Sequence, residues 1–267
     1  MTLACMVCGG RLRPYFRKDY KGLHGLGTVH YERCQSCGFV LSRTHFEMSD
    51  SEWGRLNTDY HATRRGHVTP PVDDPRWIER LRKQAVCLQS LERAGVLPHQ
   101  LPWIDYGCGD GKLASYLCDL NSALQRFDPF MTVPGYLTRE DLRAGCFDLV
   151  LNTSVIEHVR DRGPLDEMAR LVAPNGVFAI HTLVREEIPA DPNWFYLVPV
   201  HCALFTNRSM QLLFEQWNFR YSLYHVDSRL WLWFRDESDP LRRVLRDPGR
   251  YLTGEIYYKQ GFADYWK

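Results

Sequence analysis

The sequence predicts an α/β fold with an open, mostly parallel sheet, preceded by a small metal-binding module. Three observations predict the sheet. A strand, a glycine turn and a helix follow one another at 101–118, a second strand ends in an acid 21 residues after Gly107, and a strand–helix–strand run covers 146–181. Two C-x-x-C pairs near the amino terminus indicate the module. With 267 residues, 45% of them hydrophobic, the chain can form one large domain and a small appendage.

Four cysteines form two close pairs, each followed by glycine, at Cys5/Cys8 and Cys34/Cys37. Four such thiolates match tetrahedral zinc, and the glycines let backbone N–H groups turn toward the sulfurs. Two disulfides or free thiols are the alternatives. The odd total of nine cysteines, with no signal peptide expected before the first pair, favours a reducing compartment. We therefore expect a structural Zn²⁺ ion and a cytoplasmic protein.

Charge is unevenly distributed between the module and the whole chain. Residues 1–43 contain seven Lys or Arg against Asp19 and Glu32, whereas the formal net charge of the chain is only +1. The basic surplus suits a solvated face or a phosphate contact better than an extended nucleic-acid surface.

A short helix and a linker are expected between the module and the sheet. The linker is broken at Pro70-Pro71, after which Asp74 is a predicted N-cap and Pro75 occupies the first turn of a new helix. The apolar positions that fit one face of this helix are Ile78, Leu81, Ala85, Leu88 and Leu91.

The run from Leu101 to Lys112 is the most informative segment. An apolar strand ends in Asp105 and leads through Gly107, Gly109 and Gly111 into a helix. Glycine permits positive φ and close approach of a ligand, while the helix directs unpaired N–H groups toward it. A dinucleotide fingerprint would place its third glycine one residue later. The acid beside the glycines suits a ligand with a cationic centre, and a turn that binds nothing is the alternative.

The strand Leu124–Phe127 ends at Asp128, which is where a βαβ unit places a carboxylate against ribose hydroxyls. A surface Asp-Pro turn is the alternative. Farther along, 146–153 reads as a buried parallel strand and 164–171 as a helix, which Asn175-Gly176 ends before a strand at 177–181.

These segments resemble class I S-adenosylmethionine-dependent methyltransferases, in particular those with a Glu-His pair after the fourth strand: "DYGCGDGK" is similar to their first motif, and "FDLV…VIEHV…ARLVAPNGVFAI" to their middle part. The resemblance covers about residues 75–235. It implies a Rossmann-like sheet with its last strand antiparallel, and S-adenosyl-L-methionine as cofactor. The cofactor contacts that it implies are Asp105, Gly107, Cys108, Gly109, Gly111, Asp128, Pro129, Asn152 and Thr153.

One interval departs from the family pattern. Only 19 residues separate Asp128 from Asp148, without a convincing helix and strand, where similar enzymes carry their third strand and an adenine contact. We expect an abbreviated sheet edge, with the adenine neighbourhood at 137–141.

A four-cysteine module before such a domain is similar to the deoxysugar C-methyltransferases and, more loosely, to certain ribosomal RNA guanine methyltransferases. The phrase "ERCQSCGFVLSR" and Tyr60-His61 are closer to the sugar group.

Methyl transfer to a hydroxyl or an acidic carbon needs a base near the cofactor. His158 is the first choice because it follows the fourth strand, His201 is nearly as good, and His181 reads as a core residue. Tyr196 is an expected acid, base or substrate contact, and Glu157 accompanies His158. In similar enzymes the Glu-His pair also packs structurally or meets the cofactor.

The expected divisions are a zinc module at 1–45, a helix and linker at 46–73, the cofactor domain at 74–238 and an aromatic extension at 239–267. Within the domain, 183–199 is an expected substrate lid, and 221–227 with 229–235 a β-hairpin in which Trp231 and Trp233 are core residues. The aromatic tail could cover the substrate or a second subunit.

The sequence thus predicts a methyltransferase acting on a small polar acceptor, a sugar or sugar nucleotide, at carbon or oxygen. The alternatives are an RNA base methyltransferase that uses the zinc module to bind its substrate, and a non-catalytic zinc adaptor or cofactor sensor. No apolar run approaches the ~20 residues that cross a membrane, so no membrane partner is expected, and the pattern leaves the oligomeric state open.

Overall fold

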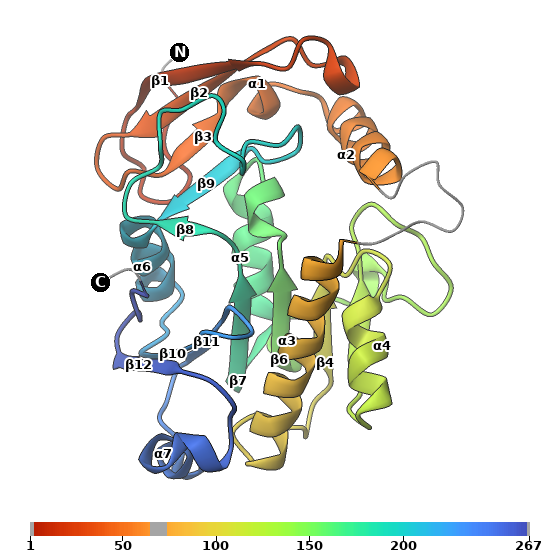
Figure 1. Cartoon of the computed structure of the whole chain (residues 1–267), viewed down its shortest axis with the longest axis vertical. Coiled ribbons are helices and arrows are strands. Elements are labelled where there is room, and N and C mark those ends of the chain that lie inside the picture. The colour runs from red at the N-terminus through yellow and green to blue at the C-terminus, as the bar shows by residue number, and fades with distance from the viewer. Residues whose placement is uncertain (1–2, 65–73, 266–267) are drawn as a thin grey trace.

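The computed structural model describes residues 3–64 and 74–265, so the predicted Pro70-Pro71 break lies outside the described residues. Two sheets organise the chain. The amino-terminal sheet has five strands in the order β1-β2-β3-β9-β8, and the larger sheet has seven in the order β12-β10-β11-β7-β6-β4-β5. The smaller sheet lies beyond the carboxyl ends of the parallel strands of the larger one (Figure 1).

The amino-terminal sheet combines two distant parts of the sequence. Its first three strands are antiparallel, and β9 then pairs with β3 while β8 pairs with β9. Its strands are β1 (Leu12–Asp19), β2 (Thr28–Cys34), β3 (Val40–Ser42), β8 (Val184–Arg185) and β9 (Ala203–Thr206). The helices in this amino-terminal part of the chain are η1 (Leu23–Gly25), α1 (Arg43–Phe46) and α2 (Asp50–Arg64). The sheet therefore extends beyond residue 45, and the proposed division into domains stays a prediction.

The larger sheet is mixed. β5, β4, β6 and β7 are parallel neighbours, whereas β11 pairs antiparallel with β7, β10 with β11, and β12 with β10. Its strands are β4 (Trp103–Tyr106), β5 (Gln125–Phe127), β6 (Phe147–Thr153), β7 (Val172–His181), β10 (Tyr221–His225), β11 (Leu230–Phe234) and β12 (Ile256–Gln260). β5 is the edge strand, because the described segment after it forms only the short helix η2 (Arg139–Asp141), and this confirms the abbreviated edge.

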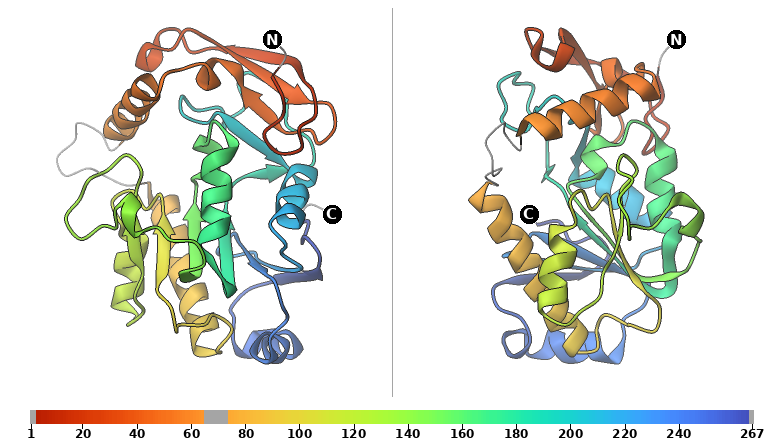
Figure 2. Two further views of the ribbon diagram at one scale, coloured as in Figure 1. Left: turned by 180° about the vertical axis from the view of Figure 1, so that it is seen from behind. Right: turned by 90° about the vertical axis from the view of Figure 1, so that its right-hand side faces the viewer.

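Helices cover both faces of this sheet (Figure 2). The remaining helices are α3 (Pro75–Arg93), α4 (Lys112–Asp119), η3 (Ile156–His158), α5 (Arg162–Leu171), α6 (Asn207–Gln216), α7 (Asp239–Arg246) and η4 (Pro248–Arg250). As predicted, the Asp74 side chain caps α3 and Pro75 begins it. Alternation along the strands directs Trp103 into the core beneath α3 and α4, and Ile104 into the core shared with α5 and the amino-terminal sheet.

The predicted end of the helix at Asn175-Gly176 is wrong. α5 ends at Leu171, and Val172 already has extended dihedral angles. Gly176 lies within β7, where a Cβ atom would stand 2.9 Å from the carbonyl oxygen of Phe147. The glycine thus permits close packing against the neighbouring strand at a register irregularity.

The carboxyl-terminal extension belongs to the fold. The predicted hairpin is present as β10 and β11, and β12 adds a strand beyond it. Trp231 and Trp233 are buried, as predicted, and Phe262 packs against both. Residues 256–260 of the tail therefore extend the sheet. Among the described residues, the helices are all too short or too polar to span a bilayer.

Candidate functional site

The glycine turn between β4 and α4 is tied to the end of β5. The N–H groups of Gly107 and Cys108 donate to the carbonyl oxygen of Phe127 at 2.7 and 3.0 Å. Gly107 has φ +77°, and a Cβ atom there would stand 2.7 Å from a methyl carbon of Val155. Both the backbone conformation and the space exclude larger residues at this position.

Asp128 lies against this turn. One carboxylate oxygen accepts the N–H of Gly109 at 3.0 Å, and the other accepts the N–H of Phe130 at 2.9 Å. The exposed Pro129 follows it. The acid predicted to meet a ribose is therefore fixed beside the middle glycine, at the carboxyl edge of the sheet.

Asp105 is the buried acid at the end of β4. Its side chain is 2% exposed, and its Oδ1 atom has no hydrogen-bond partner among the described residues. Burial, with a smaller contribution from the charge of Asp128, raises the pKa of Asp105 to about 7. A buried carboxyl without a partner is what a cationic group of a bound ligand would stabilise, so the site fits S-adenosylmethionine.

Tyr136 is a site residue that the sequence analysis missed. Its hydroxyl donates to the carbonyl oxygen of Gly109 at 3.0 Å, and its ring lies 4.9 Å from the guanidinium carbon of Arg126. A Cβ atom on Gly111 would stand 2.7 Å from Arg126. The segment after Asp128 thus folds back over the glycine turn, with the Leu137 N–H donating to the carbonyl of Arg126. No sequence pattern marks such a return.

Asn152 and Thr153 end β6 on the same edge. Asn152 is fully buried and its amide donates to the carbonyl of Ala179 at 3.4 Å, while Thr153 is half-buried. Arg80 of α3, which was not predicted, donates to the Ser154 hydroxyl at 3.4 Å. Burial first, and then the Arg80 charge, hold the pKa of His181 well below its ordinary value, which fits a neutral core histidine.

The four predicted catalytic side chains come together although 37 residues lie between His158 and Tyr196. The rings of His158 and His201 lie 5.0 Å apart, and those of Tyr196 and His201 lie 4.4 Å apart. The Tyr196 hydroxyl donates to one oxygen of Glu157 at 2.8 Å, and Thr182 donates to the other at 2.9 Å. Burial raises the pKa of Glu157 despite these donors.

His201 has a defined tautomer. Its Nδ1 atom lies 2.7 Å from the carbonyl oxygen of Tyr196, which can only accept, so Nδ1 carries the proton and the neutral ring has its lone pair at Nε2. Glu157, His158 and His201 have potential metal ligands within 4.8 Å of one another. Both oxygens of Glu157 accept hydroxyl hydrogen bonds, and we interpret the set as an acid–base cluster.

Residues 3–64, which we call the amino-terminal module from here on, form the other wall of this cluster. His61 of α2 lies 5.8 Å from His158, ring to ring. Five side chains or N–H groups of the module donate to carbonyl oxygens of 188–202: Tyr15 to Ile188, Tyr20 to Val198, His45 to Pro199, Tyr31 to His201 and the Ser42 N–H to Cys202. The predicted lid at 183–199 is therefore attached to the amino-terminal sheet, and it contains β8, a strand of that sheet.

The four module cysteines converge. The Sγ–Sγ distances are 3.7 Å from Cys5 to Cys37, 3.4 Å from Cys8 to Cys34 and 3.5 Å from Cys8 to Cys37, and none of them is in a disulfide. Four sulfurs around one Zn²⁺ at ~2.3 Å would stand about 3.8 Å apart. The donor set therefore fits a single tetrahedral ion.

An α/β sheet with a glycine turn at the carboxyl ends of its parallel strands is typical of enzymes that bind a nucleotide cofactor there. The chain belongs to the methyltransferase domain family, whose model matches residues 77–223, more than half of its length. This outcome confirms the predicted methyltransferase class for the matched residues.

Two curated relatives are ubiquinone biosynthesis O-methyltransferases. The protein of Caulobacter sp. (strain K31) is 29% identical over 143 residues, 45% of this chain and 57% of the relative. That of Caulobacter vibrioides is 30% identical over 135 residues, 43% and 54% of the two chains. The chain spans little more than half the length of these relatives. The structure of magnesium protoporphyrin IX methyltransferase from Synechocystis is 16% identical, with a TM-score of 0.41, and the match covers 67% of this chain and 95% of that one.

Proposed function

We propose that this protein methylates a small polar acceptor, a sugar or sugar nucleotide, at an oxygen or an acidic carbon, with His201 as the base. The observation that carries the proposal is the hydrogen bond between Nδ1 of His201 and the carbonyl oxygen of Tyr196. It holds the ring beside His158 with a lone pair at Nε2, which is the protonation state that a general base requires.

The cofactor residues have separate roles in this proposal. The backbone of the turn contacts the ligand at Gly107, Cys108, Gly109 and Gly111. Asp105 stabilises the cationic end of the ligand, and Asp128 with Pro129 contacts its ribose. Asn152 and Thr153 line the same edge. When bound, S-adenosylmethionine supplies a methyl group already activated by a sulfonium. The protein therefore only has to align the acceptor and remove one proton.

The acceptor residues divide into a base and its supports. His201 takes the acceptor proton at Nε2 while the acceptor oxygen or carbon forms its bond to the methyl group. His158 orients the acceptor or serves as the base in its place. The hydrogen bond from Tyr196 to Glu157 fixes the loop that carries His201, so both are positioning residues.

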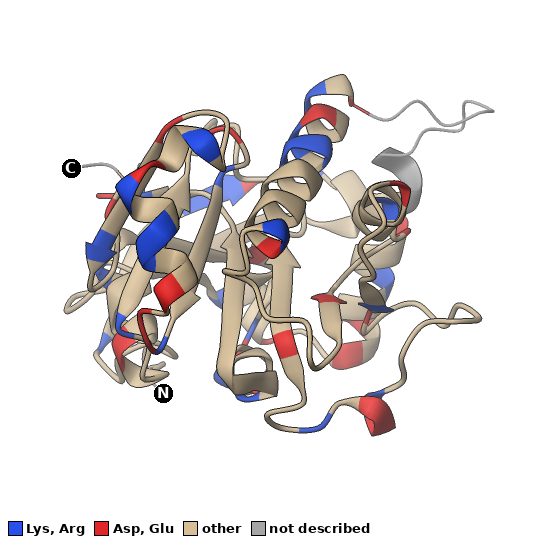
Figure 3. Ribbon diagram, turned by 90° about the horizontal axis from the view of Figure 1, so that it is seen from below, with Lys and Arg blue, Asp and Glu red and all other residues tan. Residues whose placement is uncertain are grey.

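Support for a polar acceptor comes from the composition of this wall, in which the ring of His158 lies beside those of His61 and His201. A phenolic acceptor is the second candidate, because the curated relatives are O-methyltransferases of ubiquinone biosynthesis and Phe195, beside Tyr196, is 76% exposed. RNA is less favoured, since 33 basic and 32 acidic residues are interspersed on the elements (Figure 3).

A parallel screen tests the acceptor class. Nucleotide sugars, simple phenols and a short RNA are incubated with the protein and cofactor, and release of S-adenosylhomocysteine is measured. We expect turnover with a nucleotide sugar. Turnover with phenols alone would favour the second candidate, and RNA binding that weakens steeply with salt, without sugar turnover, would favour the RNA alternative.

The base is then tested with the acceptor that turns over. His201→Asn should lower kcat by about 100-fold or more, while the control His30→Asn, at an exposed position of β2, should not. Full activity of His201→Asn would leave His158 as the base if His158→Asn is inactive, and positioning alone as the mechanism if that variant is active too.

A further inference from the structure

Two arginines that follow the Glu157–His158 pair both reach into the amino-terminal module. Arg160 donates to the carbonyl oxygens of Met48 at 2.6 Å and His45 at 3.4 Å, and it pairs with Asp50. Its guanidinium carbon lies 5.4 Å from the ring centre of Trp53. The Arg160 side chain is only 12% exposed, whereas that of its ion-pair partner Asp50 is 99% exposed.

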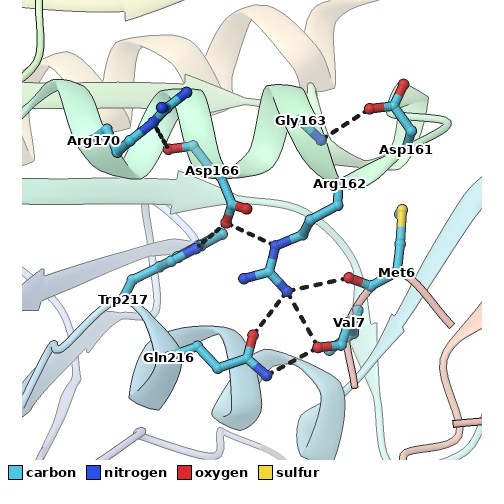
Figure 4. A network of polar contacts seen from close by, with 9 residues as sticks. All are labelled: Met6, Val7, Asp161, Arg162, Gly163, Asp166, Arg170, Gln216 and Trp217. Carbon is cyan, nitrogen blue, oxygen red and sulfur yellow. Dashed lines mark hydrogen bonds and ion pairs between the residues drawn. The ribbon is translucent and has the colours of Figure 1, made fainter. Parts of the chain in front are cut away.

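Arg162, the first residue of α5, binds the first cysteine pair, Cys5–Cys8, which we call the first knuckle (Figure 4). Its Nη1 atom donates to the carbonyl oxygens of Met6 and Val7, at 3.1 and 3.2 Å, and these are the two residues between Cys5 and Cys8. Gln216 of α6 accepts from the same nitrogen at 2.8 Å and donates to Val7 at 3.0 Å.

Asp166 fixes the guanidinium from the other side. It accepts from Nε of Arg162 at 2.7 Å and from the indole N–H of Trp217 at 2.8 Å. These donors, together with the arginine charge, lower the pKa of Asp166 against the effect of its partial burial. The knuckle, α5 and α6 are therefore joined by one network in which the guanidinium is the common donor.

Electrostatics gives this position a further role. Four thiolates around Zn²⁺ carry a net charge of −2, and a guanidinium bonded to the carbonyl groups of the knuckle partly compensates that charge. The second knuckle, Cys34–Cys37, is attached to β9, because the Thr206 hydroxyl donates to the carbonyl of Cys37 at 2.6 Å. Thr206 ends β9, four residues after Cys202, which directly follows His201.

We propose that Arg162, assisted by Arg160, is a positioning residue that couples the four-cysteine zinc site to the histidines of the acceptor site. Loss of the metal would loosen both segments that carry these histidines, the one with His158 through the arginines and the one with His201 through β9. The cofactor turn has no part in this network. The inference rests on the proposed zinc and acceptor sites.

The test compares Arg162→Gln with Arg170→Gln. Arg170 lies on the same helix and is exposed, and its guanidinium contacts only the carbonyl of Asp166 within that helix among the hydrogen bonds shown in Figure 4. Both proteins are purified with one zinc per chain, and three quantities are measured: zinc release to a chromogenic chelator, hydrogen exchange of 156–160 and 199–206, and affinity for S-adenosylmethionine.

We expect Arg162→Gln to release zinc about 10-fold faster, with faster exchange in both segments and cofactor affinity within about twofold of the wild type. Arg170→Gln should behave as the wild type. If Arg162→Gln does not fold, Arg162→Lys takes its place. Lysine keeps the charge but not the forked geometry, so this variant should release zinc faster than the wild type. Wild-type release or exchange in the folded variant, or a protein without zinc, would overturn the proposal. Because these measurements need no acceptor, they remain valid if the proposed substrate class fails.

Discussion

The Tyr196 hydroxyl donates to a carboxylate oxygen of the buried Glu157 at 2.8 Å. The same hydroxyl accepts the N–H of Leu183 at 3.2 Å. Burial, and then the charge of Glu157, raise the pKa of Tyr196 well above its ordinary value, so the phenol stays protonated. A neutral donor thereby stabilises a buried acid and connects the segment after β6 to the loop before β9.

Removing this hydroxyl should destabilise the protein. Tyr196→Phe leaves the Glu157 oxygen and the Leu183 N–H without that partner, which costs about 1–3 kcal/mol. Chemical denaturation measures the difference. The control is Tyr257→Phe, whose hydroxyl bonds to Glu255 at the surface and whose loss should change the free energy of unfolding by less than about 0.5 kcal/mol. Equal stabilities of the two variants would contradict the role of Tyr196.

Cofactor affinity should depend on Asp128. Asp128→Ala removes the carboxylate that accepts the Gly109 N–H and the proposed ribose contacts, so affinity for S-adenosylmethionine should fall by roughly 10- to 100-fold. Isothermal titration calorimetry measures it. Asp119→Ala, at the exposed end of α4, is the control. An unchanged affinity in Asp128→Ala, with the fold intact by circular dichroism, would remove Asp128 from the cofactor site.

The sequence predicted the parallel strands, the hairpin, the glycine turn and the helix cap because their signals are local. Three glycines and an acid within seven residues, or Asp74 before Pro75, specify backbone conformation through neighbouring residues alone. The arrangement of Tyr136 over Gly109 and of Arg162 on the first knuckle depends on packing between segments far apart in the chain. The β8–β9 addition to the amino-terminal sheet was missed for the same reason, because it pairs segments that lie far apart in the chain.

Zinc should be held by the module and not be required by the cofactor domain. We expect one zinc per chain by metal analysis, and its loss in Cys37→Ser but not in Cys118→Ser, which changes an exposed cysteine of α4. Cofactor affinity should change less than about threefold in Cys37→Ser, because one of the two hydrophobic cores contains no residue of 3–64. Loss of cofactor binding together with zinc would show instead that the two parts fold as one.

The titration of Asp105 gives the last prediction, which concerns stability against pH. Burial and the nearby charge of Asp128 raise the pKa of Asp105 from 3.8 to about 7 in the folded protein, so between these values the folded state holds a proton that the unfolded state has lost. The contribution of Asp105 to the free energy of unfolding therefore falls as pH rises through this window, by up to about 1.4 kcal/mol per pH unit, and levels off above it. Buried His45, whose pKa burial lowers to about 4, acts in the opposite direction below its ordinary pKa, so the wild-type curve alone does not isolate Asp105. The difference between Asp105→Asn and the wild type does: the variant should gain stability relative to the wild type as pH rises from 5 to about 7, measured by urea denaturation without cofactor. A difference that is constant over this range would show that Asp105 is ionised throughout, and its Oδ1 atom would then need a cationic partner even before the cofactor binds.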